Sequence, residues 1–300
     1  MRRAIQAMAL GLFALAGNAN AQNADLIFGE RTAALAMDEH CALFTDRQRA
    51  ALDAARLQAR GALLRSGITP ARLQAYGDDI AGDAAALACD AEDVVAMRSR
   101  VLVAFEGYLR VPNMAFPGDA FIWTADRQVI TDQPVWALLQ DTGRIRAGIS
   151  SVDGEFRFTV ALPTGGDFIS AILVTRNTER APALYDPTMG GLFPGPVNAP
   201  WARWTPPDFA RKLVWASDQI SGPDADALAN AAQGHVFRFP VSVVHQLAAL
   251  DPRETAHIDL MNRNGERIAS EYFEIGDFAA AIAFLRAAIP EGSDINLPES

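Results

Sequence analysis

The chain has 300 residues, of which 50% are apolar and 21% are charged, and its formal net charge is −10. This composition provides for a sizeable core and excludes wholesale disorder. The acidic balance makes nucleic acid a poor partner, because an acidic surface repels phosphate backbones, and it repels anionic lipid in the same way. We therefore expect one large folded domain or two ordinary ones.

The first 21 residues have the pattern of a cleavable signal peptide. Arg2 and Arg3 form a short basic start, and residues 4–16 are apolar and uncharged. Ala19-Asn20-Ala21 has the form of an A-x-A cleavage site, which predicts Gln22 as the mature N-terminus. The stretch is too short for a stop-transfer helix, and an uncleaved anchor is the alternative. The pattern predicts a periplasmic or secreted protein with no membrane span after cleavage.

Residues 22–111 have the composition and spacing of a helical domain. Thr45 and Gln48 have the spacing of a capping box, in which a hydroxyl caps the helix and a glutamine follows three residues later. The apolar side chains that follow recur at helical spacing, with a polar stripe opposite them. We expect this helix to run to Arg65.

Two further helices are expected before the character of the sequence changes. Thr69 followed by Pro70 combines a cap residue with proline at the first helical position. This second helix is predicted to run to about Cys89. Asp90 is expected to cap a third helix, which continues to about Leu109.

The chain has two cysteines, Cys41 and Cys89. An even number in an exported protein favours a bridge. Two helices joined by a short turn lie antiparallel, so a cysteine before the first and one at the end of the second fall at the same end of the hairpin. We predict a structural Cys41–Cys89 disulfide. A redox-active pair or free thiols are the alternatives, but the C-x-x-C spacing of redox motifs is absent.

From residue 112 to residue 290 we expect a β-rich domain. Residues 155–162 alternate, with Phe156 and Phe158 on one face and Glu155 and Arg157 on the other, as in a half-buried strand. The connections are too short for crossover helices, so the sheet should be mostly antiparallel. Further strands are expected at 120–125, 135–140, 145–150 and 168–176.

Residues 180–208 form a long segment rich in proline and glycine. Loops of this length are uncommon unless they are functional or disordered. Four aromatic residues argue against disorder and are the candidate binding residues, as an apolar platform for a sugar, a peptide or a protein. They are Tyr185, Phe193, Trp201 and Trp204. The alternative is that they pin the segment to the sheet as part of the core.

The C-terminal part of the chain alternates strand and helix. Its expected elements are a strand at 236–239, a helix at 240–250 and strands at 255–261 and 268–275. Asn264-Gly265 predicts a hairpin turn, and Asp277 is expected to cap a final amphipathic helix. Residues 291–300 have the pattern of a flexible tail. The predicted fold class is α+β: a disulfide-stapled helical unit, then a β-rich mixed unit ending β-α-β-β-α.

Two stretches resemble known proteins. Residues 58–67, together with residues 41–45, resemble exported alphaproteobacterial proteins of unknown function, which implies export and a helical N-terminal half. Residues 239–286 are similar to the C-terminal unit of the invasion-associated locus B family, in which a helix, two strands and a Gly-Phe-x-x-Ala segment follow one another. Here the segment 276–280 carries an extra aspartate. The resemblance implies a periplasmic accessory or interaction role and assigns no functional residue.

No catalytic, metal or cofactor motif is evident. Residues 38–41 group four possible metal ligands, but consecutive residues on a helix point in different directions, so a structural role is favoured over a metal site. Residues 148–152 lack the second glycine of a G-x-S-x-G nucleophile motif. No two histidines have metal-ligand spacing on one element; the four are His40, His235, His245 and His257.

Export, acidity and the aromatic segment favour a non-enzymatic periplasmic binding or interaction protein. The expected partner is an envelope protein or a cell-wall component. One alternative is a hydrolase acting on an envelope polymer, with a carboxylate or one of the histidines His235, His245 and His257 as base. The other is a small-molecule carrier. A cleft with His and Ser or converging carboxylates favours the enzyme, a flat aromatic patch favours the binding protein, and a closed apolar cavity favours the carrier.

Overall fold

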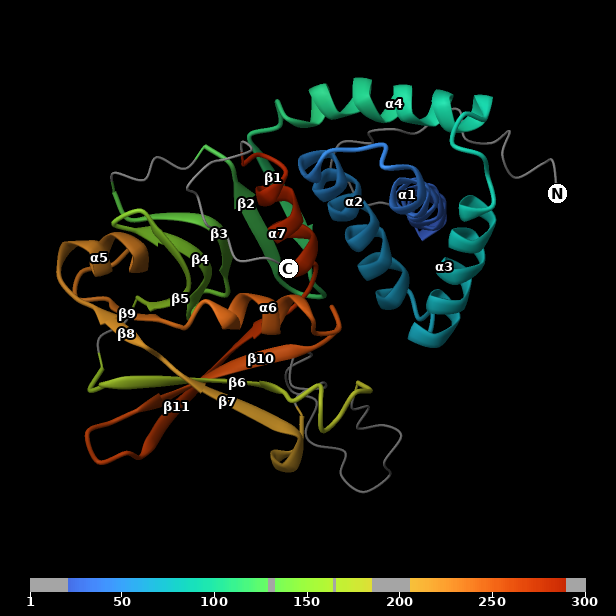
Figure 1. The fold of residues 1–300 in the computed structure, drawn as a ribbon. Helices are drawn as coiled ribbons and strands as arrows, with labels where there is room; N and C mark the ends of the chain where they lie inside the picture. The colour runs from blue at the N-terminus through green and yellow to red at the C-terminus, as the bar shows by residue number, and fades with distance from the viewer. Residues whose placement is uncertain (1–20, 129–132, 164–165, 185–205, 290–300) are drawn as a thin grey trace. The chain divides into compact units, whose positions relative to one another are not determined.

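The computed structural model describes residues 21–128, 133–163, 166–184 and 206–289. Within them the chain forms two compact units (Figure 1). One contains the chain up to Met114 with a short C-terminal segment from Ile282, and the other runs from Ala115 to Ala281. The α+β fold expected from the sequence is confirmed, because helices come first and two antiparallel sheets follow.

The described part of the helical unit begins with four long helices. Thr45 caps the second, since its hydroxyl accepts from the Gln48 amide while its own amide donates to the Gln48 side chain. Thr69 caps the third by accepting from the Arg72 amide, with Pro70 in the first turn. These hydrogen bonds confirm both predicted caps. Each cap side chain satisfies a backbone amide of the first turn that has no partner within the helix. The helices are α1 (Ala21–Cys41), α2 (Asp46–Arg65), α3 (Pro70–Ala85) and α4 (Glu92–Tyr108).

The start of α4 differs from the prediction. Asp90 was expected to be its cap, but Ala91 occupies that position and makes no side-chain hydrogen bond, so that prediction was wrong. A turn in which the Ala91 amide donates to the Ala88 carbonyl carries the chain past Asp90 before the helix begins. Glu92 and Asp93 instead supply the negative charge that a helix N-terminus favours.

The Cys41–Cys89 disulfide is formed, as predicted. It joins the end of α1 to the segment between α3 and α4, next to a cluster of buried apolar residues from all four helices. Alanines are frequent in this cluster, so the helices pack closely with small side chains between them. The cluster consists of Ala33, Ala34, Met37, Phe44, Leu52, Ala84, Val94, Met97 and Val101.

The β-rich unit contains two sheets in the described residues, and the strand pairings within them are antiparallel, as expected. Sheet A has, in spatial order, β1 (Asn113–Pro117), β2 (Ile122–Asp126), β3 (Val135–Asp141), β4 (Arg146–Val152), β5 (Glu155–Leu162), β9 (His235–Arg238) and β8 (Asp218–Ile220). Sheet B has β11 (Arg267–Glu274), β10 (Thr255–Met261), β6 (Ser170–Arg176) and β7 (Arg211–Trp215). The chain continues β9-α6-β10-β11-α7, with α6 at Ser242–Ala248 and α7 at Phe278–Arg286. Only the start of α7, up to Ala281, belongs to this unit.

Strand β5 is more deeply buried than its alternating sequence predicts. A half-buried strand was expected, but every residue from Phe158 to Leu162 is buried. Helix α5 (Pro223–Ala229) covers the second face, where Ala225 and Leu228 pack in one cluster with Ala161 of β5. The prediction was wrong here because the covering helix lies more than 60 residues further along the chain.

The two sheets pack face to face around aromatic side chains. Phe158 of sheet A and Phe273 of sheet B have ring centroids 5.6 Å apart. Trp123 of sheet A lies edge-on to Phe278, the first residue of α7, at 5.1 Å. These rings are fully buried and form the centre of the core of this unit.

One continuous stretch belongs to both sheets. Strand β7 pairs in sheet B and strand β8 in sheet A, and Figure 1 shows the two arrows nearly in line. The switch from sheet B to sheet A occurs between the consecutive residues Ala216 and Ser217. The Ala216 amide donates to Ala171 in sheet B, and the next amide, that of Ser217, donates to Arg238 in sheet A.

The face of sheet B turned away from sheet A, called the outer face below, brings distant segments together. Phe273 of β11 points toward sheet A, so its neighbour Tyr272 lies on the outer face. Tyr272 is opposite His257, His257 is opposite Val174, and Val174 is opposite Leu213. The row therefore crosses all four strands.

Candidate functional site

A polar hollow opens on the outer face of sheet B. Its cavity volume is about 520 Å³, within the range of about 300–1,000 Å³ typical of small-molecule sites. Its walls come from β7, β10, β11 and the short helix η2 (Asp208–Ala210) that precedes β7. The sheet B hollow, as it is called below, is lined by Asp208, Arg211, His257, Arg267, Ile268, Ala269, Ser270 and Tyr272.

His257 lies at the base of the sheet B hollow. Its side chain is 4% exposed, and its ring centroid is 5.2 Å from that of Tyr272. Burial lowers the pKa of His257 to about 4; the carboxylate of Asp259 opposes this, and the charges of Arg211 and Arg267 add to it. The imidazole is therefore neutral at neutral pH and offers one N–H donor and one acceptor.

Asp259 connects the other polar groups beside His257. The Ser270 hydroxyl donates to Asp259 Oδ1. Asp259 Oδ1 is 3.6 Å from His257 Nε2, and Asp259 Oδ2 is 3.6 Å from an Arg267 nitrogen. In a serine nucleophile activated by histidine, the hydroxyl would donate to the imidazole. Here the carboxylate lies between the two, so the arrangement orients charges and does not activate a nucleophile.

Two arginines flank the sheet B hollow from different strands. Arg211 donates through Nε to the Pro206 carbonyl at 2.9 Å and pairs at 2.6 Å with Asp208, whose side chain is 90% exposed. The Arg267 side chain is 57% exposed, and its nitrogen is 3.6 Å from Asp259. A guanidinium carries five N–H groups. Both arginines therefore retain donors for a further acceptor.

The structure does not bring the four histidines together. His235 accepts a hydrogen bond from the Gly166 amide at 3.3 Å, and His245 is exposed on α6. His257 lies in the sheet B hollow and His40 lies beside the disulfide. The hydrolase alternative used a carboxylate or one of His235, His245 and His257 as base, and in the described part of the chain these three histidines do not lie together.

The group of possible metal ligands near residue 40 is engaged in structural contacts. Ligand atoms of His40, Cys41 and Cys89 lie within 4.8 Å of one another, but both sulfurs are in the disulfide and offer no thiolate. Asp38 accepts from the Phe44 amide at 2.7 Å and from Arg49 at 2.9 Å. The structural interpretation of residues 38–41 accounts for these contacts.

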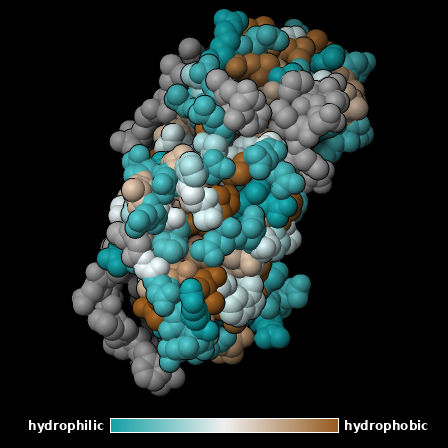
Figure 2. Space-filling model, turned by 90° about the vertical axis from the view of Figure 1, so that its left-hand side faces the viewer, coloured by the Kyte–Doolittle hydropathy of each residue, from teal (hydrophilic) through white to brown (hydrophobic). Residues whose placement is uncertain are grey.

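The four predicted binding residues lie outside the described residues, so their role stays a prediction. They are Tyr185, Phe193, Trp201 and Trp204. The sequence analysis did not predict strand β7. Two large apolar side chains of this strand are exposed, Leu213 at 60% and Trp215 at 55%, and so is Phe209 just before it, at 74%. The short apolar run Leu213-Val214-Trp215, with a β-branched and an aromatic residue, was the signal available for this strand. On the face in Figure 2, hydrophobic residues form separate groups among hydrophilic ones.

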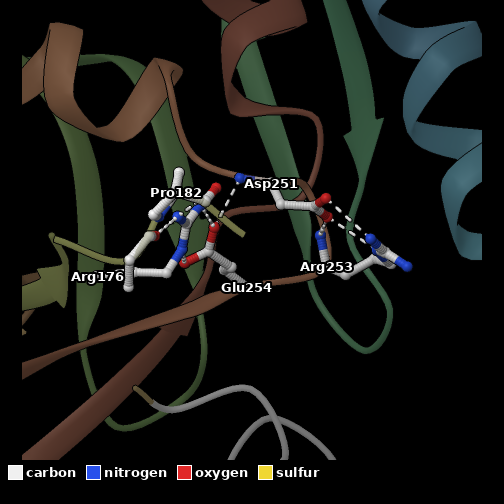
Figure 3. A network of polar contacts seen from close by, with 6 residues as sticks. Arg176, Pro182, Asp251, Arg253 and Glu254 are labelled. Atoms are coloured by element: carbon white, nitrogen blue, oxygen red, sulfur yellow. Dashed lines mark hydrogen bonds and ion pairs between the residues drawn. The ribbon is translucent and has the colours of Figure 1, made fainter. Parts of the chain in front are cut away.

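A second charged site is a buried ion pair, and Figure 3 shows the polar contacts around it. Arg176 donates to both carboxylate oxygens of Glu254, at 2.9 and 2.7 Å, and the two side chains are 5% and 0% exposed. Arg176 also donates to the carbonyls of Ala181 and Pro182, and the Asp251 amide donates to Glu254 at 2.8 Å. This pair closes the turn before β10 and has a structural role.

Glu274, at the end of β11, links the two sheets. Its carboxylate accepts from the amides of Ala120 and Phe121, at 3.0 and 2.9 Å. Burial raises the pKa of Glu274, and the backbone hydrogen bonds oppose that shift. Its main-chain carbonyl accepts from Trp123 and Gln140 at 3.1 Å. These contacts fix sheet A to sheet B and do not open to solvent as the sheet B hollow does.

Comparison with protein families, with curated proteins and with solved structures finds no match for this chain. None of the described helices is long and apolar enough to cross a membrane. The candidate site therefore rests on geometry alone, and the sheet B hollow is the place where polar groups from separate strands converge.

Proposed function

We propose that this chain is an exported, non-enzymatic binding protein that works in the periplasm and recognises an envelope protein or a cell-wall component. The leader pattern of residues 1–21 supports export. The disulfide supports it further, because such bridges form and persist in oxidising compartments. The resemblance of residues 239–286 to the invasion-associated locus B family is part of this proposal.

The observation that carries the proposal is the sheet B hollow. A cavity of ligand size, with a buried neutral histidine at its base and two arginines that retain donors, is a recognition site. Ser270 donates to Asp259 and not to His257, so the hollow supports binding over hydrolysis. Its polar lining also differs from the closed apolar cavity that a carrier of apolar molecules would have.

In-cell crosslinking tests this function. The full chain, with its leader and a C-terminal tag, is crosslinked in intact cells and captured, and bound components are identified by mass spectrometry. Arg211→Glu and Arg267→Glu reverse charges in the sheet B hollow. Arg263→Glu is the matched control, because Arg263 is exposed in the β10–β11 turn and does not line the hollow.

A component that is retained by the parent chain and by Arg263→Glu, but lost from both hollow variants, supports the proposal. Equal retention by all four proteins contradicts recognition through the hollow. The same preparation reports on export, since the intact mass reveals whether the mature chain begins at Gln22. A mass that includes residues 1–21 would rule out the cleaved leader.

A further inference from the structure

We infer that the sheet B hollow binds a small anion, with a carboxylate or phosphate group held between Arg211 and Arg267. The inference rests on the proposed function and names the chemical class of the ligand. It follows from the balance of donors and acceptors in the hollow, from the size of the cavity and from the charge of the whole chain.

Hydrogen-bond donors exceed free acceptors in the sheet B hollow. The Arg267 side chain makes no hydrogen bond to the described residues, and its guanidinium is 3.6 Å from a carboxylate oxygen of Asp259. Arg211 uses one N–H for a backbone carbonyl and another for Asp208. The remaining guanidinium N–H groups need acceptors, and carboxylate and phosphate oxygens match the planar geometry of a guanidinium.

A cation is a poorer fit for the same place. Asp259 already accepts from Ser270 and lies close to Arg267, so its charge is compensated. Asp208 is at the rim, with its side chain 90% exposed and paired with Arg211. A ligand anion can replace Asp208 on Arg211, whereas a cation would have to compete with two arginines for the two carboxylates.

Cavity size and net charge point to a small anionic group on a component outside the lipid bilayer rather than to a lipid headgroup. A volume of about 520 Å³ accommodates a small organic acid or a phosphate ester. The chain has a net charge of −10, which repels an anionic membrane surface over the screening length. The two arginines are matched by Asp208 and Asp259, so a small anion is held through the remaining guanidinium donors and not through a net positive charge of the hollow.

His257 gives the site a property that surface arginines lack. A bound anion stabilises the protonated imidazole, so anion binding raises the pKa of His257 from about 4. Binding is then coupled to proton uptake, and affinity increases as the pH falls. Among the described residues, the charged or titratable groups that face His257 are Asp259 on β10, Arg267 and Tyr272 on β11, Arg211 on β7 and Asp208 on η2, while β6 presents the apolar Val174.

Isothermal titration of the purified chain with inorganic phosphate and with citrate tests the inference. We expect one site whose affinity falls roughly tenfold or more in Arg211→Gln and in Arg267→Gln, as for the loss of a charge-assisted hydrogen bond. Arg263→Gln should bind like the parent chain. The affinity of the parent chain relative to that of His257→Gln should increase from pH 7 to pH 5, because the loss of charge by the probes themselves affects both proteins alike.

Several outcomes overturn the inference. Absence of binding by both probes, or equal binding by the three arginine variants, removes the anion site. Preferential binding to phosphatidylglycerol vesicles over the free anions contradicts the small-anion source. If a crosslinked component depends on Arg211 and Arg267 while phosphate and citrate do not bind, the ligand class is wrong and the binding function stands. If nothing depends on these residues, both fail.

Discussion

Arg176 and Arg211 are opposite each other in neighbouring strands of sheet B, yet they differ in their burial and in how many of their donors have a partner. Arg176 is 5% exposed and has all its contacts within the protein, with Glu254 as a bidentate partner. Arg211 is 27% exposed and has a partner, Asp208, that is mostly in solvent. Arg176 therefore has a structural role, whereas Arg211 retains N–H donors for a ligand. The contrast shows that the kind of residue does not decide its role, whereas the completeness of its contacts does.

The largest expected effect is at the enclosed pair. Glu254→Ala leaves Arg176 buried without its counter-ion, and breaking such a pair costs about 3–5 kcal/mol of unfolding free energy. Urea denaturation measures it. The control is Glu271→Ala, which breaks the pair with Arg144, a side chain that is 77% exposed, and should cost less than about 1 kcal/mol. Similar losses in both variants would contradict the comparison.

Removal of the Cys41–Cys89 disulfide should lower the free energy of unfolding by nearly as much as Glu254→Ala does, although neither Arg176 nor Arg211 takes part in the bridge. Cys41 and Cys89 are 48 residues apart, and opening a loop of that length costs about 4 kcal/mol in the chain-entropy estimate. The Cys41→Ala/Cys89→Ala chain should therefore unfold at lower urea concentration but bind phosphate and citrate like the parent chain. Loss of anion binding in this variant would show that the site responds to stability in general.

A smaller effect concerns the dependence of stability on pH. The pKa of His257 is about 4 in the folded chain, against an ordinary value of 6.5. Between these values the unfolded state binds more protons, so stability is present above pH 6.5 and is lost as the pH falls toward 4. The loss amounts to about 3 kcal/mol, and His257→Gln should not show it. Other groups, Glu274 included, affect both proteins alike and cancel in the difference. If the difference in unfolding free energy between the parent chain and His257→Gln is the same at pH 7 and at pH 4, this assignment is contradicted.

The smallest effect on stability is expected in the sheet B hollow itself. Arg211→Gln and Arg267→Gln remove exposed ion pairs, which contribute less than about 1 kcal/mol. Thermal unfolding without added anion measures this directly. If either variant loses about 2 kcal/mol or more of unfolding free energy, the arginine that it replaces has a structural role like that of Arg176.

Local features of the fold were predictable from the sequence. Thr45 and Thr69 were identified as caps because a cap depends on residues within one turn. The Cys41–Cys89 bridge was predictable because helix geometry carries the two ends of a hairpin together. Asp90 shows the limit, since a shift of one residue in the preceding turn moved the cap to Ala91.

The sheet B hollow was not predictable, because its lining residues come from strands that are far apart in the sequence. His257 and Arg267 belong to one hairpin, but Arg211 comes from a strand 46 residues earlier than His257. They meet only through strand order and register, which depend on the whole sheet. Strand β7 itself is five residues long, follows a segment rich in proline and does not alternate polar with apolar residues, so its sequence carries little strand signal.

The stretch that passes from β7 to β8 has a consequence for how this unit opens. Because Ala216 donates to sheet B and Ser217 to sheet A, the ladders of both sheets share one backbone. Fraying that starts at Trp215 must therefore loosen the pairing of Asp218 with Arg238 as well. Amide protons on β6 and β9 should exchange with deuterium at matched rates, as a single cooperative unit in which the floor of the hollow opens only when both sheets do.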